Sequence, residues 1–82
     1  MKASIEISMY PLEKNYGTPI LEFLERLKTH SNFLIQTNSM STQIFGDYDE
    51  IMAVLTREMK TTFLKKKAVV MVLKVFNEDV RP

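Results

Sequence analysis

The chain has 82 residues, 45% of them hydrophobic, and its 11 Lys and Arg nearly balance its 10 Asp and Glu. This length fits one domain over residues 1–82, and a net charge of +1 provides no large electrostatic footprint for nucleic acid. The absence of Cys excludes disulfides and thiolate metal sites. No apolar run is long enough for a membrane span or a secretory h-region, so we expect no signal peptide, no membrane and a cytoplasmic location.

Residues 3–10 alternate between apolar and polar side chains, with Ile5, Ile7 and Met9 on one face. A period of two with β-branched residues predicts a half-buried strand. Pro11 ends this strand because proline cannot donate to a β ladder.

A first helix is predicted from residue 19 to about residue 29. Thr18 followed by Pro19 resembles an N-cap with proline at the first helical position. The apolar residues of this helix then share one face, which predicts a buried stripe of Ile20, Phe23, Leu24 and Leu27.

A hairpin is predicted next. Phe33–Thr37 is a short apolar run, Asn38-Ser39 is a typical turn sequence, and residues 40–46 alternate again. Thr42 and Ile44 share a face in this alternation.

A second helix is predicted from Asp47 to about Lys65, because Asp47 with Glu50 three residues later resembles a capping box. Its expected buried stripe consists of Ile51, Val54, Leu55, Met59 and Phe63. An apolar strand over residues 68–76 and a polar tail complete the chain.

The predicted order is therefore β-α-β-β-α-β. Short connections and right-handed crossovers fold this order into a four-stranded antiparallel sheet of order 4-1-3-2 with both helices on one face. The expected class is α+β, in the ferredoxin-like arrangement.

The last strand is apolar on both faces. Val69, Met71, Leu73 and Val75 share one face, and Val70, Val72 and Phe76 share the other, where only Lys74 interrupts them. A sheet with helices on one side and water on the other should alternate. We therefore expect a second copy of the chain to cover the helix-free face, in a homodimer or homotetramer; scattered apolar groups on an edge strand are the alternative.

Catalytic and metal chemistry finds little support. His30 is the only histidine and lies at the predicted end of the first helix, where a positive charge favours the helix dipole. A Ser-His-Asp triad is formally possible, but nothing resembles a nucleophile elbow. An acylphosphatase-like enzyme would need an arginine in the loop after the first strand, whereas the arginines are Arg26, Arg57 and Arg81. We predict no catalytic residue and no metal ligand.

The lysines at residues 65–67, with Lys60 before them, are the one charge run. A solvated helix end explains them, since cations there oppose the negative end of the dipole. A landing site for phosphate or RNA is the alternative, although the glycine-aromatic signature of RNA-binding sheets is absent.

Asn38–Thr42 contains three hydroxyls and an amide within five residues. Thr42 is predicted to point between sheet and helices, where an unpaired hydroxyl costs on the order of 1–3 kcal/mol. A small heterocycle with ring nitrogens and an amino group could supply its partner, while an ordinary polar turn is the alternative.

Four short stretches occur in the order and spacing of a known family, and one of them is Asp47–Val54, which leads into the second helix. Ser8–Leu12 is similar to its Ser-Leu-Tyr-Pro-Met stretch, Ser41–Gly46 to its Ile-Ser-Thr-x-x-x-Gly stretch, and Val69–Met71 to its last strand. Over residues 3–77 the chain resembles the YkoF-like thiamine/hydroxymethylpyrimidine-binding proteins.

This resemblance implies a ferredoxin-like fold that binds thiamine or hydroxymethylpyrimidine without catalysis, in carriage or salvage of the vitamin. Carried over to this chain, Met9 lines the ligand pocket and Thr42 contacts the pyrimidine, with Ser41 as its neighbour in the motif. We expect Phe23 of the first helix to form an apolar wall of this pocket together with Met9. Family members with two repeats pair them sheet to sheet, which implies a homo-oligomer for a chain with one repeat.

The chain also departs from the family pattern. Ser39 precedes Met40 where the tandem protein has His, and Lys74 and Phe76 replace smaller residues. A lysine near the pocket would repel the thiazolium cation but favour a phosphate ester. Asp47 and Asp49 could balance a cation, although capping suits Asp47 better.

The alternative function is an oligomeric interaction or structural module without a small ligand. A filled core at Thr42 would favour that module, and a cavity there would favour ligand binding.

Overall fold

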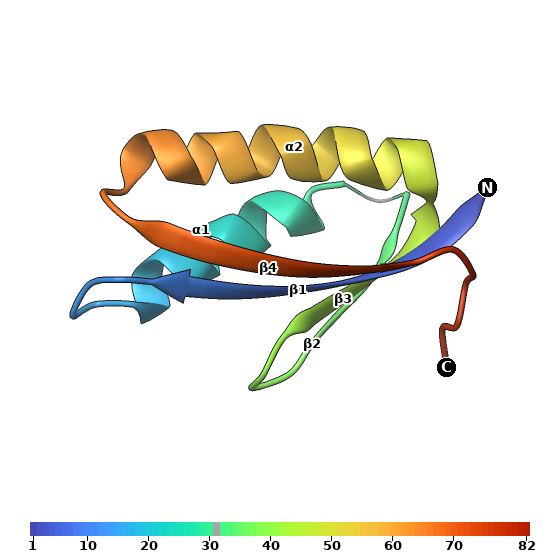
Figure 1. Cartoon of the computed structure of the whole chain (residues 1–82), viewed down its shortest axis with the longest axis horizontal. Coiled ribbons are helices and arrows are strands. Elements are labelled where there is room, and N and C mark those ends of the chain that lie inside the picture. Colours follow the sequence, from blue (N-terminus) through green and yellow to red (C-terminus); the bar gives the residue numbers. More distant parts are fainter. Residues whose placement is uncertain (31) are drawn as a thin grey trace.

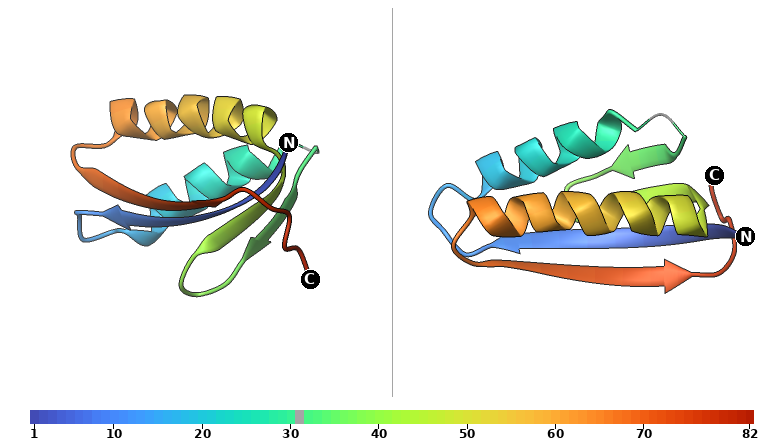
Figure 2. Two further views of the ribbon diagram at one scale, coloured as in Figure 1. Left: turned by 45° about the vertical axis from the view of Figure 1, so that its right-hand side comes forward. Right: turned by 90° about the horizontal axis from the view of Figure 1, so that it is seen from above.

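Four strands and two helices form two layers in the computed structural model, which describes residues 1–30 and 32–82 (Figure 1). In chain order these elements are β1 (Lys2–Pro11), α1 (Gly17–Lys28), β2 (Leu34–Thr37), β3 (Thr42–Asp47), α2 (Tyr48–Lys65) and β4 (Val69–Phe76). The strands form one antiparallel sheet of order β2-β3-β1-β4, and both helices cover the same face (Figure 2). This is the predicted order 4-1-3-2 counted from the other edge, so the α+β ferredoxin-like prediction is confirmed.

β1 lies between β3 and β4 but pairs with them over different lengths. β3 pairs with residues 2–7 of β1, ending where Ile7 faces Thr42. β4 pairs with residues 4–11 and continues to Pro11. The β2–β3 hairpin therefore diverges from the end of β1 (Figure 1), and residues 8–11 have a strand on one side only.

The core fills the space between this sheet and the two helices. Its buried members come from both layers and are Ile5, Ile7, Phe23, Leu24, Leu27, Ile44, Ile51 and Leu55. The predicted inward faces of β1 and β3 are confirmed, since Ile5, Ile7 and Ile44 are buried in this core. Ser4 and Phe45 have the opposite parity but are buried as well, at 8% and 6% exposed. Among the described residues, no helix is both long and apolar enough to cross a membrane.

α1 begins before the predicted position. Its first residue is Gly17, and Tyr16 occupies the N-cap without a side-chain hydrogen bond, so the prediction of Thr18 as N-cap is wrong. Pro19 falls on the third helical residue instead. At the third helical residue, as at the first, a missing N–H removes no hydrogen bond of the helix, because the first-turn N–H groups have no acceptor within the helix.

α2 begins as predicted, since the Asp47 carboxylate accepts a hydrogen bond from the Glu50 N–H at 3.2 Å. Its buried stripe differs from the prediction, because Phe63 is 48% exposed. The residues that α2 buries are Ile51, Leu55, Glu58 and Thr62.

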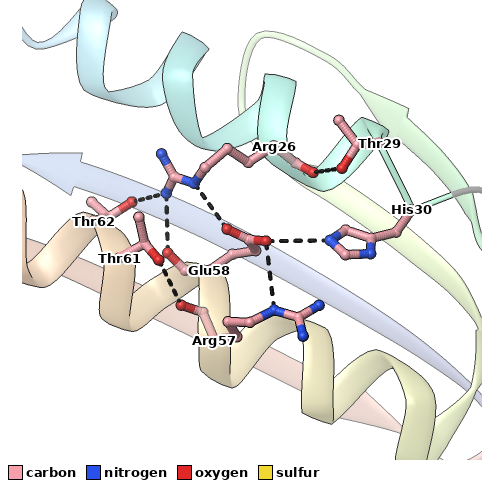
Figure 3. Close-up of polar contacts among 7 residues, drawn as sticks. All are labelled: Arg26, Thr29, His30, Arg57, Glu58, Thr61 and Thr62. Carbon is pink, nitrogen blue, oxygen red and sulfur yellow. Dashed lines mark hydrogen bonds and ion pairs between the residues drawn. The ribbon is translucent and has the colours of Figure 1, made fainter.

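Glu58 and Thr62 are buried because they meet Arg26 of α1 (Figure 3). Arg26 Nε donates to Glu58 Oε1 at 2.9 Å, and its Nη2 donates to Thr62 Oγ1 at 2.6 Å. His30 Nε2 lies 3.2 Å from the other carboxylate oxygen of Glu58. Polar side-chain contacts thus join the two helices in addition to their apolar packing.

The helix-free face of the sheet carries exposed apolar side chains. Val70, Val72 and Phe76 are 47%, 49% and 47% exposed. The C-terminal tail crosses one end of this face, where Ser4 Oγ donates to the Glu78 carbonyl at 2.7 Å. Val70 and Val72 of β4 remain half-exposed to solvent in the part of the chain that the structure describes.

Candidate ligand-binding cavity

A cavity of about 420 Å³ lies beneath α1, at the place where the hairpin diverges from β1. One wall is apolar and includes Phe23 of α1 and Met9 of β1. The opposite wall is the polar end of the hairpin, residues 37–42. No Asp, Glu, Lys, Arg or His occurs among the described residues that line it, so its walls are uncharged.

The hairpin wall is held in shape by Asn38. The side-chain oxygen of Asn38 accepts hydrogen bonds from the N–H groups of Met40 at 2.8 Å and Ser41 at 3.0 Å. The Asn38 N–H in turn donates to the Ser41 carbonyl at 3.0 Å. This local bonding turns the chain within four residues, as expected for Asn at a turn.

The four residues predicted from the sequence all line this cavity, namely Met9, Phe23, Ser41 and Thr42. Phe23 is buried and Met9 half-buried, because each lies on the inward face of its element. The structure thus brings together residues that are 33 positions apart in the chain. Their roles as ligand contacts stay predictions.

The Thr42 hydroxyl has a partner within the chain. Its Oγ1 lies 3.1 Å from Oγ1 of Thr37 across the β2–β3 pair, and Thr42 is 4% exposed. The hydrogen-bond partner that a ligand was expected to supply is therefore present in the protein itself. Each hydroxyl has one donor and two acceptor positions, so the pair retains capacity for another group.

The Ser41 hydroxyl is used outside the cavity. It donates to Glu6 Oε2 at 2.9 Å and accepts from the Gln43 side-chain amide at 2.8 Å. The hydrogen bond from Ser41, with the nearby charge of Lys74, holds the pKa of the Glu6 carboxyl below its usual value. Ser41 thus contributes to the cavity as part of the turn, while its hydroxyl is directed toward Glu6.

The expectation that Lys74 lies near the pocket is wrong. Lys74 faces Glu6 across the β1–β4 pair on the helix-free side, with 3.6 Å between Nζ and Oε1. No residue of β4 lines the cavity. The strand alternation explains this, since Lys74 has the parity of Val70 and Val72 and not that of the inward Leu73.

The rim of the cavity includes large apolar residues that sequence reasoning missed. Leu12, Tyr16 and Met40 are 67%, 63% and 83% exposed, and all three line the cavity. The available signal was their position, because each is a large apolar residue within an otherwise polar loop or turn. Such exposed apolar rims are typical of ligand-binding grooves.

The ionisable groups of the molecule cluster elsewhere, between the helices. Burial alone would raise the pKa of the Glu58 carboxyl, but hydrogen bonds from His30 and Arg26 outweigh it and hold the pKa below its usual value. Within residues 1–30 and 32–82, no three His, Asp or Glu side chains gather in a way that could hold a metal ion.

The fold and this uncharged cavity define a small ferredoxin-like domain with an internal cavity between sheet and helix. The sequence model of the family described as thiamine-binding protein matches residues 5–80. The chain belongs to this family.

Solved structures share the fold. A Streptococcus pneumoniae protein is 22% identical with a TM-score of 0.88, covering 98% of this chain and 90% of its own. A Thermotoga maritima protein, assigned provisionally to thiamine biosynthesis or salvage, is 16% identical with a TM-score of 0.85, covering 95% and 85%. A hypothetical protein of Methanocaldococcus jannascii is 25% identical with a TM-score of 0.81, covering 99% and 84%. No curated protein matches the chain.

Proposed function

We propose that this protein binds thiamine or its hydroxymethylpyrimidine precursor in the cavity beneath α1, without catalysis, and thereby supports carriage or salvage of the vitamin. Membership of the thiamine-binding family supports a binding role. The observation that carries the proposal is the composition of the cavity, which sets an apolar wall opposite a wall of hydroxyl and amide groups.

These walls suit an aminopyrimidine. The ring is flat, uncharged and apolar on its faces, so it can pack against Phe23 and Met9, whose thioether favours contact with aromatic rings. Its edge carries ring nitrogens and an amino group, which need hydrogen-bond partners such as the Thr42 hydroxyl. The volume of about 420 Å³ lies within the usual range for small-molecule sites.

The uncharged walls also indicate where the thiazolium ring of thiamine lies. A thiazolium cation would lose its hydration if it were buried among apolar groups without a counter-charge. The proposal therefore places the pyrimidine inside and the thiazolium at the rim formed by Leu12, Tyr16 and Met40, where water reaches it.

Calorimetric titration with thiamine and with hydroxymethylpyrimidine tests the proposal directly. We expect saturable heat and a rise in melting temperature with both ligands, because a ligand that binds only the folded state stabilises it. Thr42→Val should weaken binding at least about tenfold, whereas Thr56→Val on the exposed side of α2 should not. Absence of heat and of any melting shift at millimolar ligand would overturn the proposal.

A second function is favoured by the helix-free face. The half-exposed row of Val70, Val72 and Phe76 would lose solvent contact against a second copy of the chain, in a homodimer or homotetramer. Sedimentation of wild type and Val72→Glu separates the two functions. A monomer in both samples would count against an interaction module, and assembly without ligand binding would favour it.

A further inference from the structure

The peptide groups of β1 point alternately toward its two neighbouring strands, and two hydrogen bonds fix which residues point where. The Met1 carbonyl accepts from Tyr48, which follows β3, at 2.8 Å. The Leu12 N–H donates to the carbonyl of Ala68, which precedes β4, at 3.0 Å. Successive residues of a strand alternate in the direction of their backbone N–H and C=O. Odd-numbered residues of β1 therefore direct both groups toward β3, and even-numbered residues direct both toward β4.

The register of β1 extends this parity to Met9. Pairing with β4 is continuous from Ser4 to Pro11, so no bulge shifts the alternation. Met9 therefore directs both its N–H and its C=O away from β4. On that side the last pair is Ile7 with Thr42, and at Met9 β3 is no longer present.

The space that Met9 faces is the cavity. Met9 lines it from β1, and the hairpin residues that would otherwise continue the ladder form its opposite wall. Pro11, the next residue of the same parity, has no N–H to offer. Met9 is thus the position in this part of β1 where a donor and an acceptor lie together on a strand edge without a strand partner.

We propose, on the basis of the function proposed above, that the Met9 N–H and C=O recognise the edge of a 4-aminopyrimidine and make the site selective for 4-amino over 4-oxo rings. The ring nitrogen beside the amino group accepts from the Met9 N–H, and the amino group donates to the Met9 C=O. An unpaired strand edge offers this donor–acceptor pair in the way that it offers it to an added β-strand.

The order of donor and acceptor gives the selectivity. In a 4-oxo ring the ring nitrogen carries a proton and the exocyclic oxygen accepts, so both positions are reversed. Such a ring matches Met9 only after it is turned over, which exchanges the sides of its 2-methyl and 5-methylene substituents. In the turned orientation the bulky 5-substituent points at the cavity wall instead of the rim. In the original orientation the ring N–H faces the Met9 N–H and the exocyclic oxygen faces the Met9 C=O, so neither pair forms a hydrogen bond.

Oxythiamine, the 4-oxo analogue of thiamine, tests this on the unaltered protein. We expect oxythiamine to bind at least about tenfold more weakly than thiamine in calorimetric titration, as for the loss of a buried hydrogen-bond pair. Equal affinity would overturn the selectivity proposed for Met9 and leave the proposed function standing. Failure of both ligands to bind would overturn the function itself.

The amide protons supply a second measurement. In a nitrogen–proton correlation spectrum, thiamine should move the Met9 amide downfield and slow its exchange with solvent. The amides of Ser8 and Tyr10 point toward β4 and serve as internal controls. A Met9 amide that stays unchanged at saturating thiamine would overturn the proposal.

Variants at Met9 separate the backbone from the side chain. Met9→Pro removes the N–H without breaking a bond to β4, whereas Met9→Leu keeps the N–H and similar bulk. We expect Met9→Pro to bind thiamine at least about tenfold more weakly than Met9→Leu. Equal affinity of two folded variants contradicts the inference; if Met9→Pro does not fold, the amide shift of the wild type decides.

Discussion

Arg26 on α1 donates hydrogen bonds to both the side chain and the backbone of Glu58 on α2. Its Nε donates to the Glu58 carboxylate at 2.9 Å, and its Nη2 donates to the Glu58 backbone carbonyl at 3.0 Å (Figure 3). The second oxygen of the carboxylate lies 3.2 Å from His30 Nε2. The two helices are therefore joined by one largely buried carboxylate, whose two oxygens contact Arg26 and His30, and protonation of this carboxylate should weaken the joint.

The first prediction concerns acid stability. The pKa of Glu58 is depressed in the folded protein, so its carboxylate contributes stability that is full above the unfolded value near 4.5 and is lost as the pH falls through the lower folded value. We expect the melting temperature of the wild type to fall steeply in that window. The Glu58→Gln variant should show a flatter dependence there, measured by thermal unfolding across acidic pH.

The same variant should also be less stable at neutral pH. The neutral amide of Glu58→Gln would leave the Arg26 charge without its counter-charge, at a cost of about 1–3 kcal/mol in free energy of unfolding. Glu50→Gln, on the exposed start of the same helix, is the matched control, because it removes an equal charge without burial. Equal losses in the two variants would contradict the buried joint.

The buried stripe of α2 shows where sequence reasoning stops. Leu55, Met59 and Phe63 are spaced by four, and each such step turns the helix by about 40° beyond a full turn. Phe63 therefore lies about 80° from Leu55 and leaves the core face, while Glu58 and Thr62 stay on it. The spacing alone would have included them, but their polarity argued for the surface, and the Arg26 that satisfies them lies on the other helix.

Strand alternation is enough to predict which strand residues of the candidate site face inward. Alternation places Met9 and Thr42 on the inward face, and the structure agrees. It does not reveal how far two strands stay paired, so neither the divergence that opens the cavity nor the free edge at Met9 could be predicted. Those features depend on where the β1–β3 pairing ends, at Ile7 and Thr42, and the same alternation continues past both residues.

A second prediction follows from the direction of the Ser41 hydroxyl. Ser41→Ala should change thiamine affinity by no more than about twofold, because the hydroxyl bonds to Glu6 and not toward the cavity. The pKa of Glu6 should rise toward its ordinary value, since the Ser41 hydrogen bond is the main cause of its depression. Carboxyl chemical shifts followed by pH titration measure this, and a large loss of affinity would show that Ser41 contacts the ligand.

A third prediction concerns Lys74. If the ligand lies in the cavity, Lys74→Ala should leave the affinities for thiamine and for its phosphate esters unchanged within about twofold, because Lys74 lies on the opposite face of the sheet. The comparison is made by calorimetry at two salt concentrations. A selective loss of phosphate-ester binding would mean that the charged part of the ligand reaches the helix-free face.

A fourth prediction uses the cavity itself. Ile20 is half-buried and lines it from α1, so a larger side chain there would grow into empty space rather than into packed core. Ile20→Phe should therefore avoid the usual overpacking cost of about 1–3 kcal/mol and keep or raise the melting temperature. It should nevertheless weaken thiamine binding at least about tenfold, because the ring and the ligand compete for the same volume.

The matched control is Leu21→Phe, one residue along α1. Leu21 is 62% exposed, so this variant adds a similar aromatic ring outside the cavity and should bind thiamine as the wild type does. A stable Ile20→Phe protein with wild-type affinity would mean that the ligand binds elsewhere.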